Sequence, residues 1–257
     1  MEQQRVAVVV GGASGIGWAT ARVLAEDGYA VALADLDGEA VAARAAELGE
    51  PHVGVPVDVT DEASVEALFD TVGERWPAVH GVVNCAGVST LGAVVEHDAA
   101  EFRRVVDVCL TGAFLVLKHG GRRVVDGGAL VSLTSLNARQ PGTGLAAYCA
   151  SKAGLVALTE VAALELAPRR VRVNAVAPGL VVTPLTAPAM DIPGIREGYL
   201  ENTPLGRSGE PAEIGAAVRY LLSDDAAWIT GETLDINGGA HLQRYPDLLG
   251  LVTKAFA

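Results

Sequence analysis

Short runs of apolar residues recur along the chain, and each run ends at Gly, Asp, Asn or Pro. The runs are RVAVVVGG, AVALADLD, VGVPVDVT, VHGVVNCAG, GALVSLTSL, VRVNAVAPG and ETLDINGG. The early runs are continuous rather than alternating, which is typical of strands that are covered on both faces. The pattern therefore predicts seven β-strands.

Stretches with helical periodicity fill the gaps between these strands. They are GIGWATARVLAEDG, EASVEALFDTVGERW, EFRRVVDVCLTGAFLVLKHG and AAYCASKAGLVALTEVAALELA. Alternation of strands and helices predicts an α/β fold of the Rossmann type, with a doubly wound, seven-stranded parallel sheet. No stretch rich in Pro, Gly or Ser divides the chain, so residues 1–257 are expected to form a single domain.

Two segments depart from this regular alternation. Residues 183–207 contain four prolines and are long for a connection within a compact domain. Such loops are usually functional or mobile, so we expect this one to form part of a pocket wall. The tail at residues 240–257 carries enough apolar side chains to pack either on another subunit or near the pocket.

Composition and charge exclude several classes of protein. Hydrophobic residues make up 50% of the chain and charged residues 19%, and no apolar run reaches the roughly 18 residues that would cross a bilayer. A net charge of -12 disfavours nucleic acid and anionic membranes as partners. The start, MEQQRVAVVV, is typical of a strand rather than a signal peptide, so we expect a cytoplasmic protein.

The cysteines and histidines do not indicate a metal site. Cys85, Cys109 and Cys149 lack CxxC spacing, and the five histidines are scattered along the chain. We therefore expect no metal and no disulfide, and the cysteines are interpreted as small buried apolar residues.

A glycine-rich turn follows the first strand directly and opens a helix. The turn is GGASGIG, at residues 11–17, and its glycines would let backbone N–H groups approach a pyrophosphate at the helix N-terminus. Asp35 ends the second strand, 18 residues past Gly17, where a carboxylate can accept hydrogen bonds from the adenosine ribose. Neither Ser14 nor Leu36 supplies a cation for a 2′-phosphate, so the turn favours NAD over NADP.

Together with NCAG, SLTSL, YCASK, VNAVAPG and INGG, this turn resembles the short-chain dehydrogenase/reductase family over nearly the whole chain. The resemblance implies a cofactor across the C-terminal edge of the sheet and a homo-oligomer, usually a tetramer. It places the cofactor against Gly11, Ser14, Gly15, Ile16, Gly17, Asp35, Leu36, Asp58, Val59, Asn84, Ala86, Gly87, Tyr148, Lys152, Pro178, Gly179, Val181 and Thr183.

Tyr148 and Lys152 stand four residues apart in a helical pattern, so their side chains share one side of the helix. By spacing alone the pair is typical of a solvated surface. Hydride transfer from an alcohol, however, needs a group that takes the hydroxyl proton, and a nearby ammonium would favour the phenolate that does so. The resemblance implies that Lys152 also binds the nicotinamide ribose and that Ser135 orients the substrate. Asn137 and Gln140, which follow Ser135, are candidate substrate contacts.

The chain departs from the family pattern at three positions. Val10 replaces a threonine before the first glycine, and Cys85 replaces the second residue of the usual Asn-Asn-Ala-Gly. The departure nearest the chemistry is Cys109, which replaces the asparagine of DVNLTG, a residue that helps hold a water near the lysine in many members. Because a thiol is a poor hydrogen-bond partner, either that relay is rerouted or turnover is impaired. Cys149 should point about 100° away from Tyr148 and into the core.

These patterns predict an NAD-dependent oxidoreductase that interconverts a secondary alcohol and a ketone. Its catalytic residues would be Ser135, Tyr148 and Lys152, and its substrate a small molecule. Two alternatives stay open: reduction of a 3-oxoacyl thioester, which the same motifs could serve, and a nucleotide-binding sensor or scaffold with weak catalysis, for which Cys109 is the supporting feature.

Overall fold

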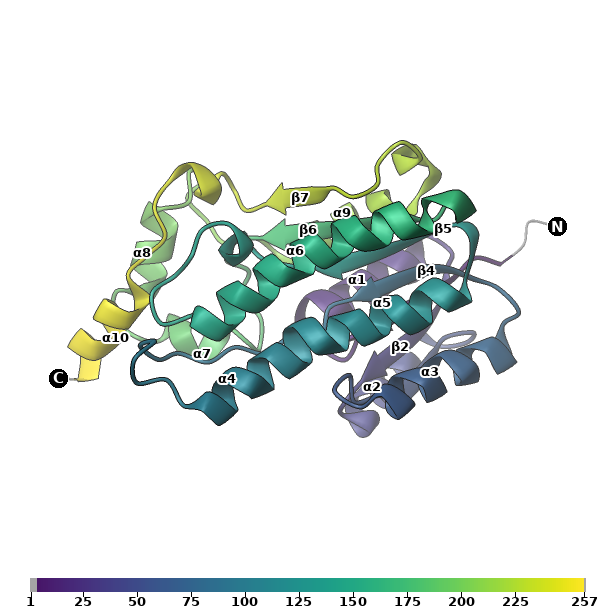
Figure 1. The fold of residues 1–257 in the computed structure, drawn as a ribbon, viewed down its shortest axis with the longest axis horizontal. Helices are drawn as coiled ribbons and strands as arrows, with labels where there is room; N and C mark the ends of the chain where they lie inside the picture. The colour runs from purple at the N-terminus through teal and green to yellow at the C-terminus, as the bar shows by residue number, and fades with distance from the viewer. Residues whose placement is uncertain (1–3, 257) are drawn as a thin grey trace.

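One parallel β-sheet runs through the middle of the molecule (Figure 1). The computed structural model describes residues 4–256. Seven strands pair in the order β3-β2-β1-β4-β5-β6-β7, and every neighbouring pair is parallel. They are β1 Val6–Val10, β2 Ala30–Asp35, β3 Val53–Pro56, β4 Val79–Asn84, β5 Val124–Leu133, β6 Arg172–Pro178 and β7 Thr233–Ile236. The predicted seven-stranded, doubly wound sheet is confirmed.

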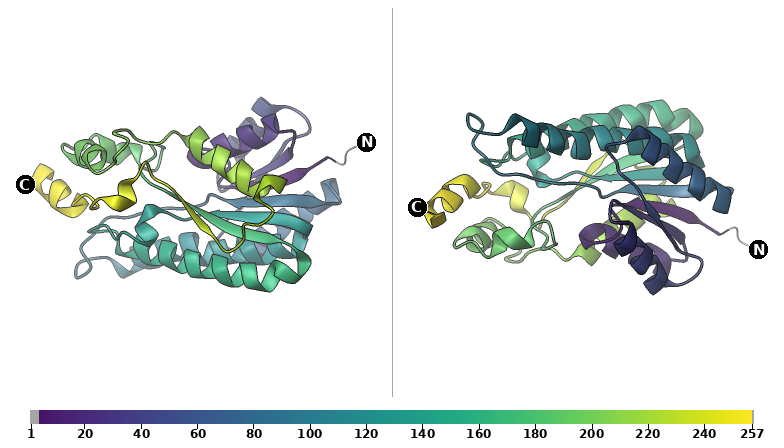
Figure 2. Two further views of the ribbon diagram at one scale, coloured as in Figure 1. Left: turned by 90° about the horizontal axis from the view of Figure 1, so that it is seen from above. Right: turned by 90° about the horizontal axis from the view of Figure 1, so that it is seen from below.

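Helices cover both faces of the sheet, as Figure 2 shows from above and below. One layer consists of α3 Glu62–Arg75, α4 Ala99–Val106, α5 Gly112–Arg123 and α6 Ala146–Leu166; the other contains α1 Gly15–Glu26, α2 Gly38–Leu48 and α9 Pro211–Leu222. The continuous apolar run of β1 explains the two layers. Val8 and Val10 belong to the core under the first layer, whereas Ala7 and Val9 belong to the core under the second. All five residues of β1 are buried, as expected for a strand covered on both faces.

The helical stretch at 101–120 is interrupted in the structure. The chain forms α4, then one π-helical turn, η1 Asp107–Thr111, and then α5. Such a turn inserts an extra residue, which a search for the ordinary helical period does not reveal. The periodicity also failed to single out α2 and α9, although Asp37 caps the first by accepting from the Ala40 N–H and a capping box opens the second.

The segment at 183–207 is more regular than predicted. It contains two short helices, α7 Ala187–Met190 and α8 Ile195–Glu201. The tail adds the 3-10 turn η5 Ala240–Leu242 and the helix α10 Leu248–Phe256. Both segments lie beyond one end of the sheet, where α7, α8 and α10 are side by side (Figure 2). Leu248 of the tail packs with Met190 and Ile195 in a small core of its own, so the tail lies near the pocket.

The helix α6 is long and apolar enough, by length and composition, to cross a membrane. In the fold it instead packs against β6, α4 and α5 within the first helix layer. Its polar residues Ser151, Lys152 and Thr159 are buried in that layer. Its place in the layered core accounts for the buried side of α6, whereas Val161 and Leu164 lie on its exposed side.

Candidate active site

Two adjoining cavities open at the C-terminal edge of the sheet. The first, of about 340 Å³, lies at the ends of β1, β2 and β4, and we call it the nucleotide cavity. The second, of about 300 Å³, lies between the end of β5, the start of α6, the α7–α8 segment and the tail, and we call it the substrate cavity. Leu185 lines both, so the two cavities are neighbours.

The glycine-rich turn forms the floor of the nucleotide cavity. Two of its glycines lie so close to other backbone atoms that no side chain would fit there. Gly11 has φ +75° and lies so close to the next loop that a Cβ would approach the Ala86 nitrogen to 2.8 Å. A Cβ on Gly17 would lie 1.9 Å from the Gly11 carbonyl oxygen. These glycines are therefore required by close backbone approach, and the turn leaves the N-terminus of α1 open toward the cavity.

Most of the predicted cofactor residues line the nucleotide cavity. They are Gly11, Ser14, Gly15, Ile16, Gly17, Asp35, Leu36, Asp58, Val59, Ala86, Gly87 and Thr183. Pro178 and Gly179 line the substrate cavity instead, next to Tyr148. Asn84 and Val181 line neither cavity. Asn84 is buried and accepts a hydrogen bond from the Ala86 N–H at 3.1 Å, and Val181 is buried against the second core, so both support the walls from behind.

The charged residues of the nucleotide cavity are both acids, Asp35 and Asp58. One Asp35 oxygen accepts from the Ala13 N–H at 3.0 Å, which ties the glycine-rich turn to the end of β2. Asp58 accepts from both the N–H and the hydroxyl of Thr60, at 2.9 and 2.7 Å. No Lys or Arg of the described chain lines this cavity. Within the described residues, its walls therefore present two carboxylates and no cation to a ligand.

Tyr148 and Lys152 both belong to α6; Lys152 lines neither cavity, but a Cβ added at Gly87 of the nucleotide cavity would lie 3.6 Å from its Nζ. Tyr148 lines the substrate cavity, and the Lys152 Nζ lies 5.6 Å from the centre of its ring. Lys152 is only 3% exposed, and its Nζ donates to the Leu133 carbonyl oxygen at 2.7 Å. Within residues 4–256 no carboxylate lies at ion-pair distance from this ammonium. Such an unpaired buried cation stabilises negative charge nearby. The pair is thus not the solvated surface pair that spacing alone would suggest.

Ser135 lies two residues after the end of β5, at the start of the 3-10 turn η2 Leu136–Ala138, and faces the same cavity as Tyr148. Its hydroxyl accepts from the Asn137 N–H at 3.1 Å and donates to the Asn137 side-chain oxygen over a long 3.4 Å. The Asn137 side-chain nitrogen donates to the Gln140 carbonyl oxygen at 3.0 Å. Asn137 therefore fixes the Ser135 loop, in addition to lining the cavity.

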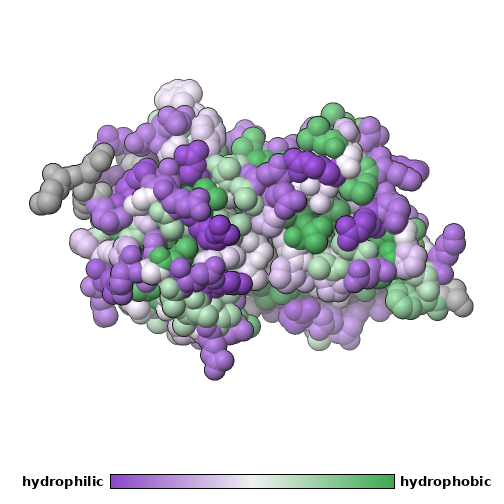
Figure 3. Space-filling view, turned by 180° about the vertical axis from the view of Figure 1, so that it is seen from behind, coloured by the Kyte–Doolittle hydropathy of each residue, from purple (hydrophilic) through white to green (hydrophobic). Residues whose placement is uncertain are grey.

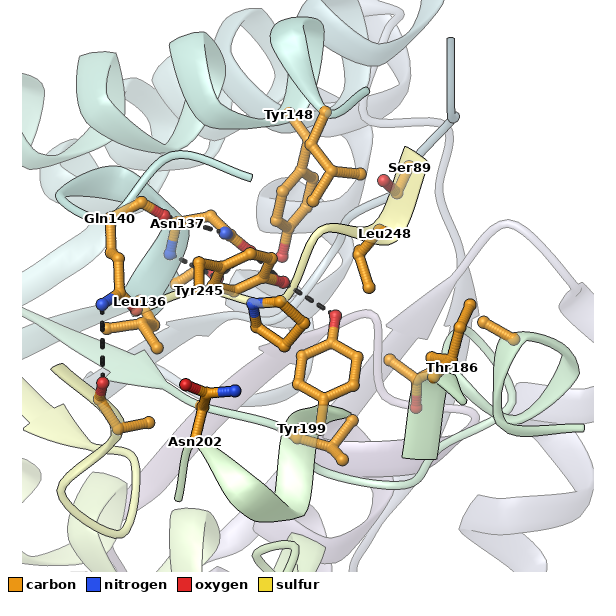
Figure 4. Close-up of a pocket in the computed structure, with 18 of the residues that line it drawn as sticks. Ser89, Leu136, Asn137, Gln140, Tyr148, Thr186, Tyr199, Asn202, Tyr245 and Leu248 are labelled. Atoms are coloured by element: carbon orange, nitrogen blue, oxygen red, sulfur yellow. Dashed lines mark hydrogen bonds between the residues drawn. The ribbon is translucent and has the colours of Figure 1, made fainter. Parts of the chain in front are cut away.

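A pair of tyrosines extends this network, and the sequence patterns did not single them out. Tyr245 of the tail donates to the Asn137 side-chain oxygen at 3.1 Å, and its own oxygen lies 2.7 Å from the Tyr199 hydroxyl of α8 (Figure 4). Because Tyr245 has a single proton, Tyr199 is the donor between the two hydroxyls. Burial raises the pKa of Tyr199 and of Tyr245, so both remain neutral donors.

Gln140 joins the same loop to the tail. Its side-chain nitrogen donates to the carbonyl oxygen of Ala240 at 3.5 Å (Figure 4) and also to that of Gln243. Its side-chain oxygen is buried and has no hydrogen-bond partner within the described chain. The two predicted substrate contacts, Asn137 and Gln140, therefore both line the cavity and also hold its walls together.

The three cysteines have different surroundings. Cys109 lies in the η1 turn, 1% exposed, and its thiol donates to the Val88 carbonyl oxygen at 3.2 Å and accepts from the Val88 N–H at 3.3 Å. Burial raises the pKa of Cys85 to about 12, so it stays a thiol. Cys149 is half-buried beside the small core of the tail and does not reach the main core, because α6 at this end faces the α7–α8 segment.

Comparison with known proteins agrees with this architecture. A family model described as enoyl-(acyl carrier protein) reductase matches residues 11–241. The cis-4-hydroxycyclohexanecarboxylate dehydrogenase of Sinomonas cyclohexanicum is 40% identical over 242 residues, which cover 92% of this chain and 96% of that protein. The 3-oxoacyl-(acyl-carrier-protein) reductase of Aquifex aeolicus is 35% identical over 243 residues, covering 92% of this chain and 97% of the relative.

A solved structure also resembles this chain in its fold. The short-chain type dehydrogenase/reductase from Mycobacterium ulcerans superposes with a TM-score of 0.94 at 33% identity, covering 99% of this chain and 96% of that one. The chain belongs to the short-chain dehydrogenase/reductase family. It is thus an oxidoreductase of a family that uses a nicotinamide cofactor and acts on CH–OH groups.

Proposed function

We propose that this protein is an NAD-dependent oxidoreductase that interconverts a small secondary alcohol and its ketone. The observation that carries the proposal is the meeting of Tyr148 and Ser135 in one cavity, with the buried Lys152 ammonium 5.6 Å from the Tyr148 ring. The nucleotide cavity adjoins this place through Leu185. A bound nicotinamide would supply the hydride chemistry.

Tyr148, Lys152 and Ser135 have different roles in the proton transfer and in holding the substrate. Tyr148 takes the alcohol proton during oxidation and returns it during reduction, because its hydroxyl points into the substrate cavity (Figure 4). Lys152 offers its positive charge to the negative charge that develops on the reacting oxygens, and the Leu133 carbonyl oxygen holds its position at 2.7 Å. Ser135 can turn its weakly held proton toward the substrate oxygen, since its bond to the Asn137 oxygen is 3.4 Å long.

The preference for NAD over NADP is supported by charge. Asp35 lies where the adenosine ribose would bind, and a 2′-phosphate beside its carboxylate would be repelled. Leu36, which is 73% exposed beside it, provides no compensating cation. The N-terminus of α1 still favours the pyrophosphate through its backbone N–H groups.

The lining of the substrate cavity supports a substrate with an apolar body. Leu136, Leu145, Met190, Ile195 and Leu248 are among its walls. A cavity of about 300 Å³ is suited to a ring or a short branched chain rather than a large ligand. The first compounds to test are the 4-hydroxycyclohexanecarboxylates, because a relative is named for one of them.

The deciding experiment is a screen of secondary alcohols with NAD, in which the absorbance of NADH is followed. Cyclic, aromatic and sugar-derived alcohols are compared with the 4-hydroxycyclohexanecarboxylates. Turnover that depends on Tyr148 is the expected result. No turnover of any alcohol or ketone with either NAD or NADP would contradict the proposal.

A second candidate is reduction of a 3-oxoacyl thioester. It is supported by the description of the matching family model and by the similarity to the Aquifex reductase. NADPH preference and cations around the cavity mouth would favour it. The acids of the nucleotide cavity disfavour NADPH, so this remains the second choice. A sensor or scaffold is the third, and measurable NADH turnover would exclude it.

We also propose that the protein is a cytoplasmic homo-oligomer, as the family resemblance implies a tetramer. Apolar side chains are exposed on the outer sides of adjacent helices: Phe102 of α4, Phe114 of α5, and Val161 and Leu164 of α6. Such exposure on neighbouring helices is typical of an interface between subunits. Mass measurement in solution tests it, and a monomer at micromolar concentration would contradict it.

A further inference from the structure

Among residues 4–256, a single charged side chain lines the substrate cavity. Arg244 lies in the tail between η5 and α10 and lines the cavity together with the catalytic candidates Ser135 and Tyr148. No Asp or Glu of the described residues lines the cavity with it. Arg244 is itself exposed to solvent, and a cation on the wall of an otherwise neutral cavity can select ligands by their charge.

Arg244 has no partner that accounts for its position. No carboxylate within residues 4–256 lies at ion-pair distance from its guanidinium, and no hydrogen bond from it is found there. Glu197 and Glu201 line a neighbouring hollow on the other side of Arg244, beyond ion-pair reach. The Asp247 carboxylate there accepts from Thr143 at 2.7 Å and from the Gly250 N–H at 3.1 Å. The donors of Arg244 are therefore available to a ligand.

The backbone around Arg244 is held in a fixed relation to the reacting groups. The next residue, Tyr245, donates to Asn137, which in turn contacts the Ser135 hydroxyl. Leu248 fixes the other side by packing with Met190 and Ile195. Apolar side chains also gather on the molecular surface toward the end that carries the C-terminus (Figure 3). The wall that carries Arg244 is thus joined through Tyr245 and Asn137 to the wall that carries Ser135.

We propose that Arg244 binds a carboxylate of the substrate, so that the enzyme selects secondary alcohols or ketones whose apolar body carries an anionic group. Arginine is suited to this role because its planar fork of N–H donors matches a carboxylate. The role also counters a disadvantage of this chain, since a net charge of -12 repels anions from a distance. The inference rests on the proposed function, because it names the substrate class of that site.

The test uses two rings of the same shape, cyclohexanecarboxylate and cyclohexanecarboxamide, of which only the first is charged. Neither carries a hydroxyl group, so calorimetry measures binding without turnover, with and without NADH. The wild-type protein should bind the carboxylate more tightly than the carboxamide. Arg244→Met should weaken carboxylate binding about tenfold, the loss expected for a charge-assisted hydrogen bond, and leave carboxamide binding unchanged. Arg244→Lys should retain part of the preference.

The matched control is Arg196→Met, which removes an exposed arginine of α8 that does not line the cavity. It should leave both affinities within about twofold of wild type, a change near the thermal energy. Equal binding of the two rings by the wild type, or a preference that survives in Arg244→Met, would overturn the inference. If alcohols are turned over but this preference is absent, the inference alone fails. If nothing is turned over, the proposed function fails, and the calorimetry still decides the role of Arg244.

Discussion

Cys109 and Val88 are joined by two hydrogen bonds, in which the thiol donates to the Val88 carbonyl oxygen at 3.2 Å and accepts from its N–H at 3.3 Å. Val88 continues the loop that passes between the two cavities. A Cβ added at Gly87 would lie 3.6 Å from the Lys152 Nζ and 3.8 Å from the Cys109 sulfur. The residue that breaks the family pattern therefore lies in the immediate surroundings of the lysine and holds the cofactor loop in place.

This contact makes the outcome of Cys109→Asn informative. An amide can donate to and accept from Val88 as the thiol does, and makes stronger hydrogen bonds to water. We expect kcat to rise by at most about tenfold, the equivalent of one recovered hydrogen bond. The larger side chain should also lower Tm, because Cys109 is packed against Val105 and Ala147. Cofactor affinity should stay nearly constant.

Steady-state kinetics and thermal melting are measured together on this variant, with Cys149→Asn as the control. Cys149 adjoins Tyr148 in sequence but packs beside the tail, so its variant should leave kcat unchanged. An unaltered kcat in a stable Cys109→Asn protein would mean that proton supply to Lys152 uses another route. Cys109 would then serve packing and loop support only.

Replacing Tyr148 by Phe should remove most of the activity. The ring keeps its place above Lys152, and only the proton-bearing oxygen is lost. We expect kcat to fall at least about a hundredfold, the usual contribution of a general acid or base, at nearly unchanged NADH affinity. Stopped-flow kinetics and NADH fluorescence measure the two quantities. Tyr220→Phe, on the outer side of α9, is the control, and wild-type turnover in the Tyr148 variant would exclude this residue as the proton carrier.

The cofactor preference should respond to charge beside Asp35. Leu36→Arg places a cation at the mouth of the nucleotide cavity, where a 2′-phosphate would lie. We expect NADP(H) affinity to increase about tenfold through one charge-assisted contact, with little change for NAD(H). Asp35→Asn should further reduce the difference between the NAD(H) and NADP(H) affinities, because it removes the repulsion between the carboxylate and the 2′-phosphate. The asparagine oxygen can still accept from the Ala13 N–H.

Calorimetry with both cofactors checks this prediction, and Leu242→Arg serves as control. Leu36 and Leu242 are both 73% exposed, but Leu242 lines neither cavity. Comparable binding of NAD and NADP by the unmodified protein would contradict the assignment of Asp35 to the ribose.

Tyr245→Phe should affect the reaction although Tyr245 need not touch the reacting atoms. Its hydroxyl satisfies the Asn137 oxygen, to which Ser135 would otherwise donate more strongly. Without it, the Ser135 proton is held by Asn137, so kcat should fall by up to about tenfold, the equivalent of one hydrogen bond. Tyr199→Phe loses only the outer bond of the network and should show a smaller effect. If both variants lower Tm but leave kcat intact, the network is purely structural.

The sequence was sufficient to predict the sheet, because each strand is marked by a short apolar run within its own residues. The continuous run VAVVV reports a strand buried on both faces, and the structure divides it between two cores as expected. The glycine-rich turn was also recognisable as a short motif, although only Gly17 is required by a neighbour within the turn, whereas Gly11 is required by its approach to Ala86 of a distant loop. Tyr148 and Lys152 could be paired because one helical turn separates them.

The parts that the sequence did not reveal depend on distant contacts. Tyr245 meets Asn137 across 108 positions of sequence, and no periodic pattern indicates such a meeting. Asn84 and Val181 were expected at the cavity wall, but which side of a wall a residue occupies is decided by packing. The π-helical turn around Cys109 was hidden because it preserves an apolar pattern while it shifts the register.

The two cavities are formed by different segments of the chain, and this difference affects how the substrate of such an enzyme could change during evolution. The nucleotide cavity is formed largely by strand ends and the turns that leave them, so a change there would disturb the sheet. Much of the substrate cavity belongs to the α7–α8 segment and the tail, which pack in a small core of their own beyond the sheet. These two segments can exchange residues at little cost to the central scaffold. A lineage could therefore acquire new substrates by replacing them together, while the machinery for the cofactor is inherited unchanged.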